Sequence, residues 1–451
     1  MHWQELLSTR RPGSGKSSAS YEHDRSAFEV DLDRIIFSHP FRRLQDKTQV
    51  HPLPEYDFVH TRLTHSLEVS SVGRSLGRKV GEKLFAPGKK YADLQVNSYD
   101  IGTIVAAASL AHDLGNPPFG HSGETSISHF FEEHPLADRF RAEFDDKQWA
   151  DVTNFEGNAE GFRILNKSGH QGLKLTAASL AAFSKYPRES KIRAKDPNRC
   201  SHKKYGFFQT ERERFAEVAG YCGLPSLGQG DELIFNRHPL AFLVEAADDI
   251  CYSIIDLEDG CRLGLISLDE YIDLLKPILG ERFDERKLKS YTDVNEQLGV
   301  LRAMSIGELI SQSVDCFVAQ EEAMLAGTYD QPISEQIASS PDLERISAVS
   351  VLKIYRCREV VEREVAGFEI LAGLLEIFMT AVAESKLENA GKSISRKNKK
   401  ILMLMPQEVQ LALKENTADF YTLTMLVIDF VAGMTDSFAV NMYRKIKGIS
   451  I

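Results

Sequence analysis

The sequence has few cysteines, no excess of basic residues and no long uncharged apolar run. Its six cysteines include no CxxC pair, a pattern typical of reduced, buried thiols in a cytoplasmic protein. Because 65 Asp and Glu outnumber 54 Lys and Arg, the net charge is -11 and nucleic acid is not the expected default partner. No stretch approaches 18 uncharged apolar residues, and the N-terminus has no apolar signal core. We therefore predict neither membrane insertion nor export.

Helical periodicity dominates what the 451-residue sequence does contain. With 43% apolar residues, the chain can build a large core. We predict an all-α fold with helices over 62–84, 101–114, 240–257, 298–325, 349–384 and 418–443. A few short extended segments are expected, at 49–60 and 205–209, and polar loops are expected at 85–97, 186–204 and 327–342.

The N-terminal stretch RRPGSGKSS (10–18) superficially resembles a phosphate-binding loop. Such a loop needs glycine where Arg10 stands, and it must follow a buried strand, which the sequence does not provide. We interpret residues 1–30 as a flexible segment. Residues 31–451 are then expected to form a single helical domain.

Three of the predicted helices carry histidine or aspartate among apolar neighbours. His112 and Asp113 are adjacent near the end of an Ala-rich helix, His65 lies among leucines, and Asp248 lies in a largely apolar helix. Burying an unpaired carboxylate is costly, and a divalent cation would offset that cost. Two imidazoles and two carboxylates suit Mn²⁺, Mg²⁺ or Fe²⁺ and leave positions for water and a phosphate oxygen. The pattern favours a catalytic rather than a structural metal site.

Seven blocks occur in a fixed order between residues 41 and 439: FRRLQDKTQVHP (41–52), TRLTHSLEVSSVGRSL (61–76), LAHDLGNPPFGHSGE (110–124), FEGNAEGFRIL (155–165), LTAASLAAFSKYPR (175–188), EAADDICYSIIDLEDG (245–260) and DFVAGMTDSFA (429–439). The set resembles the deoxyguanosine triphosphate triphosphohydrolase family of the HD-domain phosphohydrolase superfamily. The resemblance implies an HD core over about 60–260 and a further helical part over about 261–451. It implies that His65, His112, Asp113 and Asp248 bind the metal. It also implies cleavage of a deoxynucleoside triphosphate between the 5′ oxygen and the α-phosphorus, releasing inorganic triphosphate.

The same resemblance gives His121 and Glu124 the role of a proton-handling dyad beside the α-phosphate. Glu124 would orient His121, which would handle a proton of the attacking water or of the leaving oxygen. Some relatives have a second histidine where this chain has Asn116. Asparagine can hydrogen-bond a phosphate or water but cannot shuttle a proton. Proton transfer is therefore expected to depend on His121, although His121 could instead simply cap the helix that begins near Ser122.

Substrate contacts are also implied. A triphosphate carries about four negative charges, so cations must meet it, and we expect Arg62 and Lys185 to do so. Tyr252 and Asp256 follow Asp248 at helical spacing and share its helix face. The resemblance assigns Asp256 and Gln49 to the deoxyribose, with Tyr252 filling the place of a ribose 2′-hydroxyl.

Two other functions remain open from the sequence. The chain could be another HD-type phosphohydrolase, a nucleotidase or phosphodiesterase, or a nucleotide-sensing or single-strand-DNA-binding regulator with an inactive site. The resemblance further implies a homo-oligomer, a hexamer or another assembly of dimers, with a dNTP or single-stranded DNA as a possible effector. The base preference, with dGTP favoured, stays a prediction.

Overall fold

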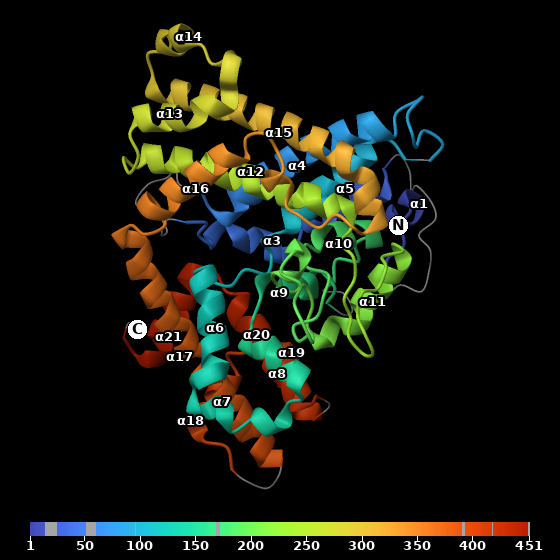
Figure 1. The fold of residues 1–451 in the computed structure, drawn as a ribbon. Coiled ribbons are helices and arrows are strands. Elements are labelled where there is room, and N and C mark those ends of the chain that lie inside the picture. Colours follow the sequence, from blue (N-terminus) through green and yellow to red (C-terminus); the bar gives the residue numbers. More distant parts are fainter. Residues whose placement is uncertain are drawn as a thin grey trace.

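The computed structural model describes residues 1–13, 25–50, 60–94, 96–167, 172–389, 393–416 and 418–449, and these residues form the predicted all-α fold (Figure 1). They contain no strand longer than an isolated bridge. The first half of the chain forms α1 (Trp3–Leu6), α2 (Ala27–Ile36), α3 (His39–Arg43), α4 (Arg62–Leu84), α5 (Ser98–Ala111), α6 (His121–Glu133), α7 (Pro135–Asp138), α8 (Asp146–Thr153), α9 (Gly157–Leu165), α10 (Ala177–Phe183) and α11 (Arg212–Tyr221).

The second half contains the longest helices. It forms α12 (Pro239–Arg262), α13 (Leu268–Leu279), α14 (Glu285–Ser290), α15 (Val294–Ala326), α16 (Ser340–Lys353), α17 (Arg358–Asn389), α18 (Arg396–Leu402), α19 (Gln407–Glu415), α20 (Phe420–Ala432) and α21 (Asp436–Lys447). Short 3-10 turns lie at Leu44–Asp46, Arg141–Glu143, Cys200–His202, Gln209–Glu211, Gly280–Arg282 and Ile333–Glu335.

The periodicity located α4, α5, α12 and α15 correctly but joined two pairs of helices that are separate. The predicted helix 349–384 is broken, because α16 ends at Lys353 and α17 begins at Arg358. The predicted helix 418–443 is also broken, since α20 and α21 meet at an angle of 110°. Thr435 begins α21 by accepting a hydrogen bond from the Phe438 amide. Apolar spacing continues through both breaks, so periodicity alone could not show them.

The expected extended segments are only partly described. Residues 51–59 lie outside the described residues, although Thr48 and Thr61 on either side of them pair as an antiparallel bridge. Phe207 forms a parallel bridge, and a 3-10 turn follows from Gln209. Of the N-terminal segment, residues 14–24 lie outside the described part, together with most of the GSGKSS motif. Before them Trp3 is buried and donates to Glu321 at 2.8 Å.

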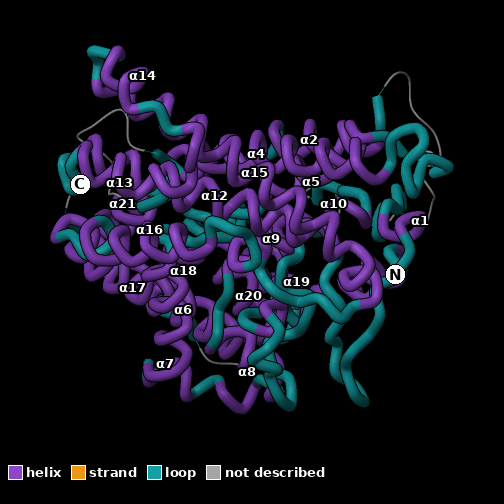
Figure 2. Tube along the Cα trace, turned by 45° about the horizontal axis from the view of Figure 1, so that its top comes forward, coloured by secondary structure: helices purple, strands orange, loops and turns teal. Residues whose placement is uncertain are grey.

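Two hydrophobic cores meet at α9. Phe162 of α9 belongs to the core built around α4, α5, α12 and α15, and Ala159 belongs to the core built around α6, α17 and α20. In Figure 1 the first core lies in the upper half and the second in the lower half, with the two termini on opposite sides. Figure 2 shows that α14 projects from the body, whereas α13 packs against α15 and α16. The chain between α5 and α6 therefore passes from one core to the other.

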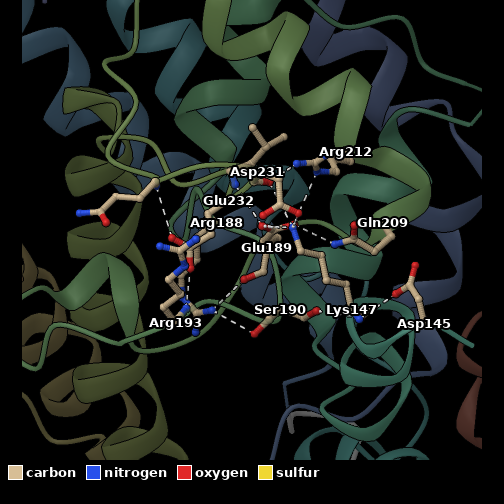
Figure 3. A network of polar contacts seen from close by, with 12 residues as sticks. Asp145, Lys147, Arg188, Glu189, Ser190, Arg193, Gln209, Arg212, Asp231 and Glu232 are labelled. Atoms are coloured by element: carbon tan, nitrogen blue, oxygen red, sulfur yellow. Dashed lines mark hydrogen bonds and ion pairs between the residues drawn. The ribbon is translucent and has the colours of Figure 1, made fainter.

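The irregular segments between α10 and α12 are fixed by buried charges rather than by regular structure. Glu189 is fully buried and accepts hydrogen bonds from Lys147, Gln209 and the Leu233 amide, each at 3.0 Å (Figure 3). Nearby, the buried Arg188 donates to backbone carbonyl oxygens of the same loops. Because these buried charged groups are hydrogen-bonded, the loop that follows Lys185 can hold a defined position without a helix or sheet.

One helix meets the length and composition expected of a membrane span. This stretch of α17, 358–386, is half buried inside the protein, where α17 packs against α6, α18 and α20. Helices α20 and α21 reach the length and composition of a membrane span only when they are taken together, and they are sharply bent against each other. Helices that pack in a protein core also have this length and composition, so the stretch is only weak evidence for a membrane span. The six cysteines are free thiols, of which Cys222 and Cys251 are fully buried.

Candidate active site

The first predicted histidine lies in the first turn of α4. Thr61 caps this helix: its hydroxyl accepts from the Thr64 amide, and the Thr64 hydroxyl accepts from the Thr61 amide at 3.0 Å. Such a reciprocal cap fixes where a helix begins. It places Arg62 and His65, which are both buried, beside the end of α5.

The second histidine terminates α5. His112 is the C-cap, and its Nδ1 lies 2.6 Å from the Ser109 carbonyl oxygen. Since a carbonyl oxygen can only accept, Nδ1 carries a hydrogen, which leaves Nε2 as the nitrogen available to a metal ion. A backbone carbonyl that holds one imidazole nitrogen in this way is typical of metal-binding histidines.

Three predicted ligands converge on one point. One ligand atom each from His65, His112 and Asp113 lies within 4.8 Å of the others, as in a group able to hold a metal ion. Asp248 joins this group from α12, since its Oδ1 lies 3.2 Å from His65 Nε2 and 3.4 Å from His112 Nε2. The four residues predicted to bind metal thus come from three segments and meet at one site.

Both carboxylates of the group also face a cation. Arg62 donates to Asp113 at 2.8 Å, and Lys185 donates to Asp248 at 2.6 Å. Burial alone would raise the pKa of Asp113, but Arg62 and His112 outweigh it and lower that pKa to about 2. Burial would also raise the pKa of Asp248, but Lys185 and His112 outweigh it and hold that pKa well below its usual value. Both carboxylates are therefore ionised at neutral pH, the form in which they bind a cation.

The loop after His112 turns back sharply. A Cβ on Gly115 would lie 2.0 Å from the Gly157 carbonyl oxygen, so only glycine allows the loop to pack on the start of α9. At Phe119 and Gly120 the backbone has φ of 65° and 62°, and α6 begins at His121. The Arg62 guanidinium lies against Gly120, where a Cβ would be 2.8 Å from Nη2. The same arginine thus contacts both the metal group and the start of α6.

His121 and Glu124 form the predicted pair. His121 Nδ1 lies 3.0 Å from Glu124 Oε2, and Glu124 Oε1 accepts from the Gly157 amide at 2.8 Å. Glu124 is buried, whereas the His121 side chain is 83% exposed. The hydrogen bond to Glu124 raises the pKa of His121 against the effect of burial. Burial by itself would raise the pKa of Glu124, but His121 and Lys204 lower it. These two shifts favour a protonated His121 imidazolium beside an ionised Glu124 carboxylate.

Further along α12, Asp256 is buried and Tyr252 is part-exposed. Tyr355 donates from its hydroxyl to Asp256 Oδ2 at 2.9 Å and stacks on the Tyr252 ring with centroids 5.4 Å apart. Burial raises the pKa of Asp256 to about 8. Gln49 Oε1 is buried and has no hydrogen-bond partner among the described residues. No contact among those residues joins Gln49 or the Tyr252–Asp256 pair to the metal group directly, so these three stay predicted substrate contacts.

Asn116 lies at the metal group, where its amide donates to Asp113 Oδ1 at 2.5 Å. No role was assigned from the sequence to Tyr355, Glu156 or Asp436. Lys204 lies 3.1 Å from Glu156 and 3.9 Å from Glu124, which places it beside the dyad. The Lys204 contacts, unlike the one between Asn116 and Asp113, join residues that are far apart in the sequence, so local spacing gave no signal for them.

A partly buried imidazole links the two long helices of the site. His60 Nδ1 lies 2.6 Å from Asp259 on α12, and its Nε2 lies 3.1 Å from Glu68 on α4. Burial alone would lower the pKa of His60, but the two carboxylates outweigh it and raise that pKa to about 10. The His60 imidazolium therefore ties α4 to α12 near the metal group.

This tie predicts a pH-dependent contribution to stability. His60→Gln is expected to lower the free energy of unfolding by about 2 kcal/mol at pH 6, the scale of hydrogen bonds to charged groups. Because folding raises the pKa of His60 from 6.5 to about 10, its contribution is complete below pH 6.5 and is lost as the pH rises toward 10. Denaturant unfolding of wild type and variant from pH 6 to 9.5 measures the difference, which should shrink.

The control is His129→Gln, since His129 pairs with Glu133 at the surface, 3.7 Å away. It should change stability little at any of these pH values. A difference between wild type and His60→Gln that stays constant up to pH 9.5 would contradict the assigned charge.

Comparison with known proteins agrees with this geometry. The HD domain matches residues 62–148, and the phosphohydrolase-associated domain matches residues 334–445. A deoxyguanosinetriphosphate triphosphohydrolase-like protein of Synechocystis is 42% identical over the whole of both chains. One of Listeria monocytogenes is 35% identical, also over both full lengths, and the deoxyguanosinetriphosphate triphosphohydrolase of Yersinia enterocolitica is 28% identical over 98% of each chain. The chain is a hydrolase with an HD domain and belongs to the deoxyguanosinetriphosphate triphosphohydrolase-like family.

Proposed function

We propose that this protein hydrolyses deoxynucleoside triphosphates, dGTP foremost, to a deoxynucleoside and inorganic triphosphate. The convergence of His65, His112 and Asp113 on one point, with the His121–Glu124 pair at the end of the loop that leaves it, carries the proposal. The names of the relatives support dGTP as the substrate.

The donor set fits a catalytic divalent cation. His65, His112, Asp113 and Asp248 would hold it, and two imidazole nitrogens with carboxylate oxygens suit Mn²⁺, Mg²⁺ or Fe²⁺. A cation bound there would place positive charge at the α-phosphate and make a water molecule more acidic. None of the four ligands is a cysteine, consistent with a catalytic rather than a structural site.

Arg62 and Lys185 would bind the phosphates. Both side chains donate to carboxylates of the predicted ligands, Arg62 to Asp113 and Lys185 to Asp248. A divalent cation would take over part of the carboxylate charge, so both side chains could then contact phosphate oxygens without moving far. Arginine suits this role because its planar guanidinium matches two phosphate oxygens at once.

His121 would act as the general acid. Water attacks the α-phosphorus, the bond from that phosphorus to the 5′ oxygen breaks, and His121 gives its proton to the 5′ oxygen of the departing deoxynucleoside. The raised pKa of His121 and the lowered pKa of Glu124 favour the imidazolium that such a step needs. Asn116, held on Asp113, cannot take this role.

Tyr252 and Asp256 would bind the deoxyribose together with Gln49. The stacked ring of Tyr355 restrains Tyr252, and the Tyr355 hydroxyl fixes one oxygen of Asp256. The other oxygen of Asp256 would form a hydrogen bond with the 3′-hydroxyl. A Tyr252 ring held in this way leaves little room for a 2′-hydroxyl, and dGTP should be preferred over GTP.

Product analysis in oxygen-18 water tests this function. With Mn²⁺ or Mg²⁺, all four dNTPs and GTP would be assayed, and dGTP is expected to give deoxyguanosine and inorganic triphosphate. Because attack occurs at the α-phosphorus, one oxygen-18 atom should appear in the triphosphate and none in the deoxyguanosine.

Orthophosphate or pyrophosphate without triphosphate would contradict the proposal and favour another HD-type phosphohydrolase. Tight dGTP binding without turnover under any metal would favour the regulator. The mass spectrum identifies the phosphate product, and a binding titration detects binding without turnover, so the three outcomes can be told apart.

Assembly and location remain predictions. We expect a cytoplasmic homo-oligomer, a hexamer or another dimer-based assembly, and exposed Val361 and Val365 on α17 offer an apolar face for it. A dNTP or single-stranded DNA effector is likewise predicted.

A further inference from the structure

A single buried carboxylate holds two segments of the site. Asp436 is the first residue of α21 and is only 2% exposed. Its Oδ1 accepts from the Phe119 amide at 3.0 Å, and its Oδ2 accepts from the Thr48 amide at 3.2 Å. The Arg363 guanidinium also donates to Oδ2. Three donors from three distant parts of the chain thus meet on one aspartate.

Both backbone amides belong to segments that carry predicted site residues. Phe119 lies two residues before His121, and Thr48 directly precedes Gln49. The backbone of Phe119 is in the left-handed region, with φ of 65°, which is unfavourable for a bulky residue unless its surroundings hold it there. The hydrogen bond to Asp436 is a direct restraint on that conformation. The Arg363 guanidinium, 5.8 Å from the Phe119 ring centroid, adds a second.

We propose that Asp436 is a positioning residue: it fixes His121 through the Phe119 amide and Gln49 through the Thr48 amide. The inference rests on the proposed function for the roles of His121 and Gln49, but not for the contacts themselves. It gives the helical part that follows the HD core a direct share in the active site. A displacement of about 1 Å at a reacting group can cost about 100-fold in rate.

The isosteric variant Asp436→Asn separates the two contacts. Oδ2 accepts two hydrogen bonds, one of them from a guanidinium, whereas Oδ1 accepts one. An amide has one accepting oxygen, which will therefore face Arg363 and Thr48 and leave its NH₂ opposite the Phe119 amide. The Phe119 turn should loosen while the Thr48 segment stays fixed.

With dGTP, Asp436→Asn is expected to lower kcat by about 10- to 100-fold and to leave KM within about twofold. Asp436→Ala removes both contacts and should lower kcat and raise KM. Hydrogen exchange supplies a readout independent of activity: the Phe119 amide should lose protection in both variants, and the Thr48 amide only in Asp436→Ala. Metal content should stay that of wild type.

Ser437→Ala is the local control, because Ser437 donates to Asp46 at 3.0 Å and touches neither amide. It should leave kcat, KM and both exchange rates unchanged. Unaltered Phe119 exchange in Asp436→Asn, or a kcat equal to wild type, would overturn the inference.

If Asp436→Ala does not fold, Asp436→Asn carries the test alone. If the wild-type protein yields no triphosphate, the proposed function fails, while the exchange of the two amides still tests the contacts of Asp436.

Discussion

Replacing Asp113 by alanine is expected to remove the bound metal and the hydrolysis of dGTP together. Asp113 gives the metal group a carboxylate oxygen, and the same side chain accepts from Arg62 and Asn116. Its loss would remove a predicted ligand and leave the buried Arg62 guanidinium without its carboxylate partner. The unpaired guanidinium would then repel an incoming metal ion. We expect kcat/KM to fall by at least about 1,000-fold. Metal content by mass spectrometry and triphosphate release measure the two effects separately.

Asp249→Asn is the matched control. Asp249 is adjacent to the predicted ligand Asp248, but its carboxylate accepts from Ser334 at 2.5 Å rather than joining the metal group. This variant should keep both metal and turnover. Full metal occupancy with normal hydrolysis in Asp113→Ala would rule out Asp113 as a ligand, and a loss of metal in Asp249→Asn of the same size would show that the effect is not specific.

The fold class and the core of the site were accessible from sequence because their signals are local. An amphipathic helix repeats its apolar residues every three or four positions, which located α4 and α12. His112 and Asp113 are adjacent, and His121 and Glu124 are three apart, so each pair could be recognised without knowing the fold. The structure then brings each of these pairs together.

The parts of the site that the sequence did not predict depend on contacts that no local pattern encodes. Tyr355 lies in the break between α16 and α17, inside a segment whose apolar spacing predicted one continuous helix. Its hydroxyl meets Asp256, 99 residues earlier in the chain. Asp436 is 317 residues from Phe119. Such partners are set by how helices distant in the sequence pack together, and packing is a property of the whole chain.

His121→Ala is expected to leave the metal in place and to slow the chemical step. His121 contacts Glu124 and none of the four predicted ligands, and its side chain is largely exposed. Metal content and KM for dGTP should therefore stay close to wild type, while kcat falls by about 100- to 10,000-fold, the range for loss of a general acid or base. Glu124→Gln should cause a smaller loss, because histidine remains but its pKa is no longer raised.

The pH profile tests whether His121 acts as the acid. An acid with a raised pKa keeps kcat high below that pKa and loses it as the pH rises through it. Wild type should show this alkaline limb, Glu124→Gln should shift it to lower pH, and His121→Ala should lack it. The matched control is His129→Ala, since His129 and Glu133 form a second histidine–glutamate pair on the same helix, farther from the metal group. The N-cap of α6 is Gly120 and no side chain among the described residues caps this helix, so His121 does not act as a cap. An unchanged kcat in His121→Ala, or an equal loss in His129→Ala, would show that the pair at the start of α6 has no part in catalysis.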